Sequence, residues 1–88
     1  MPHLLVKHGV RDYAHWKRLF DEDDNARREG GMHPVLVSHP VDDPHLAVFL
    51  LRVEDRARAE AFMARPQSAA TGEAAGVQPP FELTWLVD

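Results

Sequence analysis

The sequence predicts a single α+β domain in which helical segments separate four strands in the order β-α-β-β-α-β. Three observations support this prediction. The chain has 88 residues, which is the length of one domain. Its apolar runs are short and rich in valine and leucine, as strands are. Between them lie segments that begin at an aspartate and carry apolar residues at helical spacing.

The first half of the chain is expected to form a strand, a helix and a second strand. Residues 4–10, LLVKHGV, are typical of a strand. Asp12 is a suitable N-cap for a helix that continues to the glycine pair 30–31, because glycine readily takes the left-handed conformation that ends helices. Residues 33–41, HPVLVSHPV, then predict a second strand.

The middle of the chain is expected to continue with a turn, a strand and a helix. Residues 42–44, DDP, indicate the turn, and residues 45–53, HLAVFLLRV, form the clearest strand pattern in the chain. Asp55 is expected to cap a second helix over residues 55–65. Its buried side is predicted to consist of Ala59, Phe62 and Met63.

The last segment is expected to form a short helix and a final strand. Pro66 suits the first turn of a helix that ends near Gly76, and residues 79–87, PPFELTWLV, predict the strand. The whole order is the ferredoxin-like arrangement, a four-stranded antiparallel sheet with its helices on one face.

The central hairpin is predicted to be apolar on both faces. If Asp42 and Asp43 form its tip, residues whose numbers add up to 85 lie opposite each other, and side chains alternate between the faces. A bulge would change this pairing without changing the apolar character of either face. One face is then made of His33, Val35, Val37, His39, Leu46, Val48, Leu50 and Arg52. The other is made of Leu36, Ser38, Ala47, Phe49 and Leu51.

Two apolar faces predict a partner, because helices on one side cover only one of them. Leaving Val35, Val37, Val48 and Leu50 in water would forgo about 1.5–3 kcal/mol each. A second copy of the same sheet, related by a two-fold axis, is the simplest cover. The sequence therefore predicts a homodimer that forms through the open face of the sheet.

Composition indicates which other partners are not expected and where in the cell the protein is located. The net charge of −4, with basic and acidic residues mixed, disfavours nucleic acid as a partner. No apolar run approaches the roughly 20 residues of a membrane span, so no membrane partner is expected. The start of the chain does not have the pattern of a signal peptide, and there are no cysteines. We expect a cytoplasmic protein.

Several segments resemble the dimeric α+β barrel superfamily, in particular the small antibiotic-biosynthesis-monooxygenase and "cyclase" domains. They are VRDYAHWKRLFD, the GG that closes this helix, LRVEDRARAEAFMARP and PPFELTWLV. The resemblance implies a homodimer whose sheets pack face to face, with a cavity for an apolar or aromatic molecule. It also implies one of several activities: cofactor-free oxygenation of polycyclic phenols, haem degradation, lactone isomerisation or ring closure. The haem-degrading members have an Asn on the first strand, whereas Asn25 lies in the first helix here, so haem degradation is not expected.

His8 and Asp23 are the candidate catalytic residues. His8 lies within an apolar strand, where it is either a core residue or a neutral imidazole that moves a proton near pH 7. Asp23 ends the apolar stripe of the first helix and can pair with Arg27 one turn later. Asp23 lies at the wet end of the helix, braces a partner chain, or borders a cavity as a general base or hydrogen-bond acceptor.

Five other side chains are candidates for substrate binding. Tyr13, Trp16, Phe20 and Trp85 either stack on an aromatic ligand or fill the core. Arg52 either forms a salt bridge at the barrel rim or anchors a carboxylate or phenolate. The remaining histidines have no metal-ligand spacing, so no metal site is predicted. These histidines are His3, His15, His33, His39 and His45.

Two functions remain open at this point. No phosphate-binding loop or serine-nucleophile motif is present, so an enzyme here would work without a tightly held cofactor. Oxygenation of an electron-rich phenol meets this condition, because the anion of the substrate can itself activate oxygen. The alternative is a non-catalytic dimeric module, stress-related or an interaction domain, with a filled barrel. A cavity lined by His8 or Asp23 would favour the enzyme.

Overall fold

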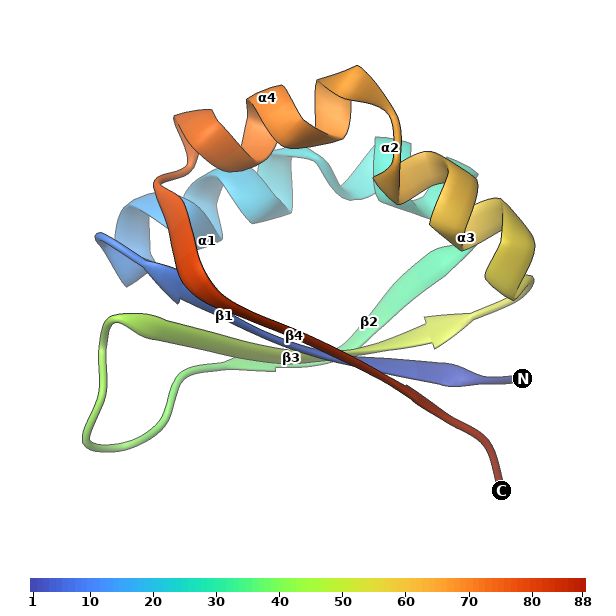
Figure 1. Cartoon of the computed structure of the whole chain (residues 1–88), viewed down its shortest axis with the longest axis horizontal. Coiled ribbons are helices and arrows are strands. Elements are labelled where there is room, and N and C mark those ends of the chain that lie inside the picture. The colour runs from blue at the N-terminus through green and yellow to red at the C-terminus, as the bar shows by residue number, and fades with distance from the viewer.

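The computed structural model describes all residues, 1–88, and has the predicted fold. A single antiparallel sheet has the strand order β2-β3-β1-β4, and all the helices lie on one face of it (Figure 1). None of the helices combines the length and the apolar character of a membrane-spanning helix. The elements are β1 (His3–Val10), α1 (Tyr13–Glu22), α2 (Asp24–Glu29), β2 (Met32–Ser38), β3 (Leu46–Val53), α3 (Arg56–Met63), α4 (Pro66–Ala74) and β4 (Val77–Leu86).

The predicted caps start α1 and α3. The Asp12 carboxylate accepts a hydrogen bond from the His15 amide at 3.3 Å, and Asp55 accepts one from the Ala57 amide at 3.0 Å. Gly31 has a φ of 78°, so the chain leaves α2 through the left-handed conformation expected of a glycine there. These local signals place the helices over the sheet.

The first helix, predicted as one piece, is two. Asp23 interrupts it with φ −89° and ψ 10°, although its amide still donates to the carbonyl oxygens of Leu19 and Phe20. The Phe20 carbonyl also accepts a hydrogen bond of 2.8 Å from Nη2 of Arg27. This bond ties α2 to the last turn of α1, and the interruption turns Arg27 inward.

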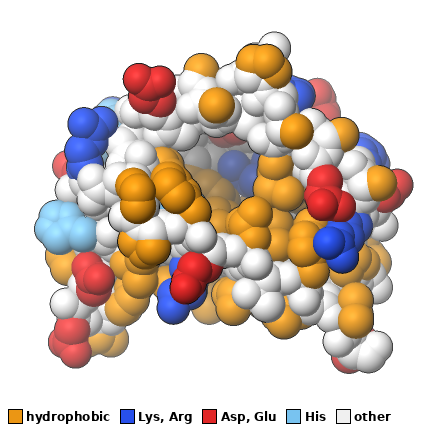
Figure 2. Space-filling model, in the orientation of Figure 1, with side chains coloured by type: hydrophobic (Ala, Val, Ile, Leu, Met, Phe, Trp, Pro, Cys, Tyr) orange, Lys and Arg blue, Asp and Glu red, His pale blue; other side chains and the backbone are white.

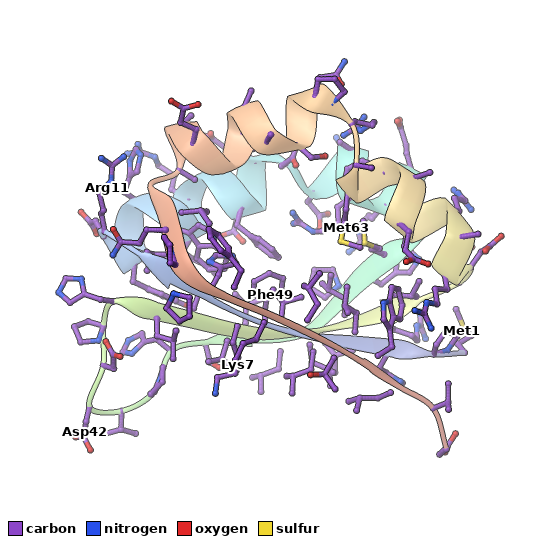
Figure 3. The ribbon with its side chains drawn as sticks, viewed as in Figure 1. Met1, Lys7, Arg11, Asp42, Phe49 and Met63 are labelled. Carbon is purple, nitrogen blue, oxygen red and sulfur yellow. The ribbon has the colours of Figure 1, made fainter.

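The helix-facing side of the central strands forms the core. Leu4, Val6 and His8 of β1 lie opposite Leu51, Phe49 and Ala47 of β3, and all of these positions face the helices. Figure 3 shows Phe49 pointing toward the helices and Lys7 pointing away from them. The buried apolar residues are Leu4, Val6, Val10, Trp16, Met32, Ala47, Phe49, Leu51, Val53, Ala59 and Ala75.

The predicted pairing of the central hairpin is correct at one end and wrong at the other. His33 lies opposite Arg52, as predicted, but a bulge between Pro34 and Leu36 shifts the register by one residue. Because a shift of one residue reverses the faces, Leu36 and Ser38 lie on the open face, and Val37 faces the helices with Phe49. The prediction for β3 holds, with Val48, Leu50 and Arg52 on the open face.

A second bulge brings β4 very close to β1. His8 pairs with Phe81 but Gly9 pairs with Gln78, so Pro79 and Pro80 are extra residues on β4. A Cβ atom on Gly9 would lie 2.5 Å from the Pro79 carbonyl oxygen, which is closer than such contacts occur. Only glycine therefore fits at this position of β1, directly after His8.

The open face of the sheet has no cover within the chain. Its centre is made of Leu5, Val48 and Leu50, which are half-buried by their neighbours, and Leu36, which is 58% exposed. Lys7 of β1 and Glu82 of β4 add an ion pair of 3.7 Å on the same face. An apolar sheet face without helices over it is the feature that the sequence predicted.

Candidate functional site

A cavity of about 620 Å³ lies between the sheet and the helices. Its size is within the range of small-molecule sites, and 14 of its 21 lining residues are hydrophobic, which suits an apolar ligand. Figure 2 shows the hollow beneath α4, bordered by hydrophobic side chains, with atoms of a basic side chain visible inside it. Arg27 is the one Lys or Arg that lines the cavity.

The cavity exists because α4 carries small side chains. Its sequence, PQSAATGEA, contributes no buried residue, and Ala69, Thr71 and Gly72 line the roof of the cavity. Beneath this roof, Phe81 and Leu83 of β4 face the helices yet remain 63% and 57% exposed. A helix with larger side chains would fill this space, so the composition of α4 keeps the site open.

His8 projects from β1 into the aromatic part of the cavity. Its ring contacts Trp16 and Phe49 edge-on, with ring centroids 5.5 Å apart in both cases. Nδ1 lies 3.2 Å from the Gly9 carbonyl oxygen, which can only accept, so Nδ1 carries the proton. Nε2 therefore has the free lone pair of the neutral ring, and no hydrogen bond from the protein engages it.

The environment of His8 favours its neutral form. Burial lowers the pKa of His8 below its ordinary value of 6.5, against the opposing effect of the backbone hydrogen bond to Gly9. The imidazole is therefore neutral at pH 7. A neutral imidazole with an unengaged Nε2, beside an apolar cavity, has the properties of a general base.

The charged groups of α1 and α2 meet the cavity where the apolar stripe of α1 ends. Asp23 and Arg27 both line it. They do not form the ion pair that their spacing predicted, because Arg27 turns toward the Phe20 carbonyl and lies 3.7 Å from Asp24 instead. The Asp23 side chain caps no helix, and its role as a base stays a prediction.

The structure brings together only some of the residues predicted for substrate binding. Trp16 and Phe20 line the cavity, with their ring centroids 4.9 Å apart. Tyr13 lies outside it and packs against His39. Trp85 also lies outside it, with the Arg56 guanidinium 4.9 Å above its ring. Arg52 is exposed on the open face, so it does not anchor a ligand in this cavity.

Sequence reasoning missed several lining residues. Met63 of α3 points toward the sheet (Figure 3) and, with Phe62, forms one wall, where the sequence indicated only a buried helix side. The sequence pattern predicts Arg27 only as a possible partner for Asp23. A signal was nevertheless present, since Arg27 lies on the apolar stripe of its helix, where a charged residue needs a specific reason.

Solved structures share this fold over almost the whole chain. A Bordetella bronchiseptica protein that carries the provisional name antibiotic biosynthesis monooxygenase has a TM-score of 0.80 at 10% identity, covering 99% of this chain and 95% of that one. A Nitrosomonas europaea protein with the same provisional name has a TM-score of 0.72 at 16% identity, covering 100% and 98%. SnoaB, a cofactor-independent oxygenase from Streptomyces nogalater, has a TM-score of 0.71 at 13% identity, covering 99% and 91%.

The fold of this chain is thus that of these antibiotic biosynthesis monooxygenase-like structures, as its sequence motifs predicted. No protein-family model matches the sequence, and no curated protein matches it. At these identities the likeness shows the fold alone, so the function has to be argued from the cavity.

Proposed function

We propose that the chain binds an aromatic small molecule in the cavity and oxygenates it without a cofactor, with His8 as the general base. The observation that carries this proposal is the unengaged Nε2 of a neutral imidazole beside an apolar cavity of about 620 Å³. The rings of Trp16, Phe20 and Phe49 offer flat apolar surfaces to such a ligand. The shared fold with a cofactor-independent oxygenase supports the same reading.

The reaction needs only a base, a dry pocket and molecular oxygen. Nε2 of His8 removes a proton from an acidic carbon of a phenolic substrate, and the resulting anion passes one electron to O₂. The two radicals combine into a C–O bond, and the peroxide that forms takes up a proton. Loss of water then leaves a carbonyl, so that R₂CH₂ and O₂ become R₂C=O and H₂O. The apolar walls favour this step because they exclude water from the anion.

We further propose that the functional unit is a homodimer formed through the open face. Leu5, Leu36, Val48 and Leu50 lie on this face, and burying the part of them that the chain leaves exposed would favour association. The dimeric module with a filled interior, which was the alternative, has less support, because the space under α4 is open and lined by both His8 and Asp23.

Oxygen consumption with 1,8-dihydroxyanthrone tests the proposed activity, because this phenol has an acidic CH₂ group. We expect the wild type to oxidise it faster than buffer does, and His8→Gln to lose about 10²- to 10⁴-fold of the enzymatic rate. His45→Gln is the matched control, since His45 is exposed and outside the cavity. A wild-type rate equal to the buffer rate, or equal rates for wild type and His8→Gln, would overturn the proposal.

A further inference from the structure

Arg27 is a buried cation with unused hydrogen-bond donors. The residue is only 6% exposed. Of its five N–H donors, one Nη2–H bonds to the Phe20 carbonyl at 2.8 Å, and no other hydrogen bond engages the guanidinium. Nε is buried and has no partner at all. Nη1 also has no partner but, unlike Nε, it is not fully buried, so it is the donor that an acceptor in the cavity would meet. A buried cation that leaves most of its donors unpaired is costly, which indicates that an acceptor comes from outside the chain.

Neighbouring acids do not supply this acceptor. Asp24 lies 3.7 Å from Nη2, but its other oxygen accepts a hydrogen bond of 2.7 Å from Nε of Arg28. Asp23 lines the same cavity without forming an ion pair with Arg27. Burial lowers the pKa of Arg27, but an arginine remains protonated in proteins, so the cation stays.

The guanidinium lies at the opposite end of a row of aromatic rings from His8. Its Cζ atom is 3.5 Å from the centre of the Phe20 ring. The Phe20 ring is 4.9 Å from that of Trp16, which in turn is 5.5 Å from the His8 ring. An aromatic ligand that lies along this row has a base at one end and a cation at the other.

We propose that the ligand of this cavity is an aromatic carboxylic acid, with its carboxylate on Arg27 and its ionisable ring at His8. This inference rests on the proposed function and narrows its substrate class. A carboxylate matches the planar fork of a guanidinium. A doubly charged phosphate matches less well, because Asp23 and Glu73 also line the cavity and Arg27 is the only Lys or Arg that does.

Calorimetric titration with 6-hydroxy-2-naphthoate and its neutral amide, 6-hydroxy-2-naphthamide, tests the inference. The two probes share the phenolic ring and differ in the group that would reach Arg27. We expect the wild type to bind the acid about tenfold or more tightly than the amide. Arg27→Gln should lose this preference and bind both probes with similar affinity, while Arg27→Lys, which keeps the charge but not the fork, should retain part of it.

Controls separate binding from structure. Arg18→Gln removes the same charge from an exposed site on α1 outside the cavity and should keep the preference. Arg27 also ties α2 to α1, so Arg27→Gln is used only if its circular dichroism matches that of the wild type; otherwise the wild-type preference and Arg27→Lys decide. If both probes bind the wild type equally, or Arg27→Gln weakens both equally, this inference fails and the proposed aromatic site stands. If neither probe binds, both fail.

Discussion

The two faces of the sheet are built from similar residues but end in different surroundings. On one face, Val6, Phe49 and Leu51 lie under the helices and border a cavity. On the other, Leu5, Val48 and Leu50 have nothing over them within the chain. Apolar character alone therefore does not determine whether a face of the sheet is covered. The size and packing of the helices above a face determine whether it is tightly packed, borders a cavity or stays uncovered within the chain.

The helix-covered face itself is only partly filled. Trp16 of α1 is 3% exposed and packs against Phe20 and Phe49, whereas α4 has no buried residue. The proposed base, His8, therefore lies beside well-packed rings, and the open space lies under α4. Such packing holds a side chain in one position, as a binding or catalytic site requires.

The largest expected effect concerns the open face. Leu50→Lys should dissociate the proposed dimer, because it places an unpaired ammonium group at the apolar centre of the interface twice per dimer, at a cost of roughly several kcal/mol for each charge. Sedimentation velocity should show a dimer for the wild type and a monomer for Leu50→Lys, with unchanged circular dichroism. A substitution on an exposed helix position, Ala70→Lys, is the control. A wild type that is monomeric at micromolar concentration would contradict the proposed interface.

The next effect concerns the packed part of the helix-covered face. Trp16→Ala should lower the free energy of unfolding by about 3–5 kcal/mol, because it removes a buried ring and leaves a void. Urea denaturation measures this loss. Trp85→Ala, at a partly buried position, should cost less. Equal losses for the two variants would mean that the packing around Trp16 contributes no more to stability than the packing around Trp85.

A pH effect follows from the lowered pKa of His8. In the folded chain the ring resists protonation, so between that pKa and the ordinary value of 6.5 the unfolded chain binds more protons. Above this pH window the His8 ring is neutral in both states and does not change the free energy of unfolding. As the pH falls through the window, His8 lowers the free energy of unfolding. Thermal melts from pH 8 to pH 5 should show a smaller decline for His8→Gln than for the wild type. Parallel declines would contradict the burial of the ring.

The smallest expected effect is a gain in stability. Gly72→Ala should stabilise the chain by up to about 1 kcal/mol, because alanine is the better helix former. A Cβ atom at this position would lie 3.8 Å from the Val77 side chain, which is an ordinary contact. Differential scanning calorimetry should show a higher melting temperature. A lower one would mean that the roof of the cavity tolerates no added group.

The sequence was sufficient for the fold because its signals are local. Asp12, Asp55 and the glycine pair mark helix ends by their own chemistry, and the Leu46–Val53 strand is apolar except for Arg52. The bulge in β2 could not be predicted from the sequence, because the register of a strand depends on how it pairs with its neighbour. That bulge reversed the faces of Leu36 and Val37.

The site was harder to predict for the same reason. His8, Asp23, Trp16 and Phe20 all line the cavity, because one strand and one helix stripe carry them. Tyr13, Arg52 and Trp85 lie elsewhere, because their directions depend on tertiary packing. The role of Arg27 depends on a break at Asp23 that the continuous helical pattern gave no reason to expect.

Methyl NMR of the wild type titrated with 6-hydroxy-2-naphthoate tests most directly whether a ligand binds in the helix-covered cavity. Binding there should shift the methyl signals of Val6, Leu51 and Met63, while those of Leu5 and Leu50 on the open face should not shift. Shifts confined to the open face, or no shifts at saturating ligand, would contradict binding in the cavity.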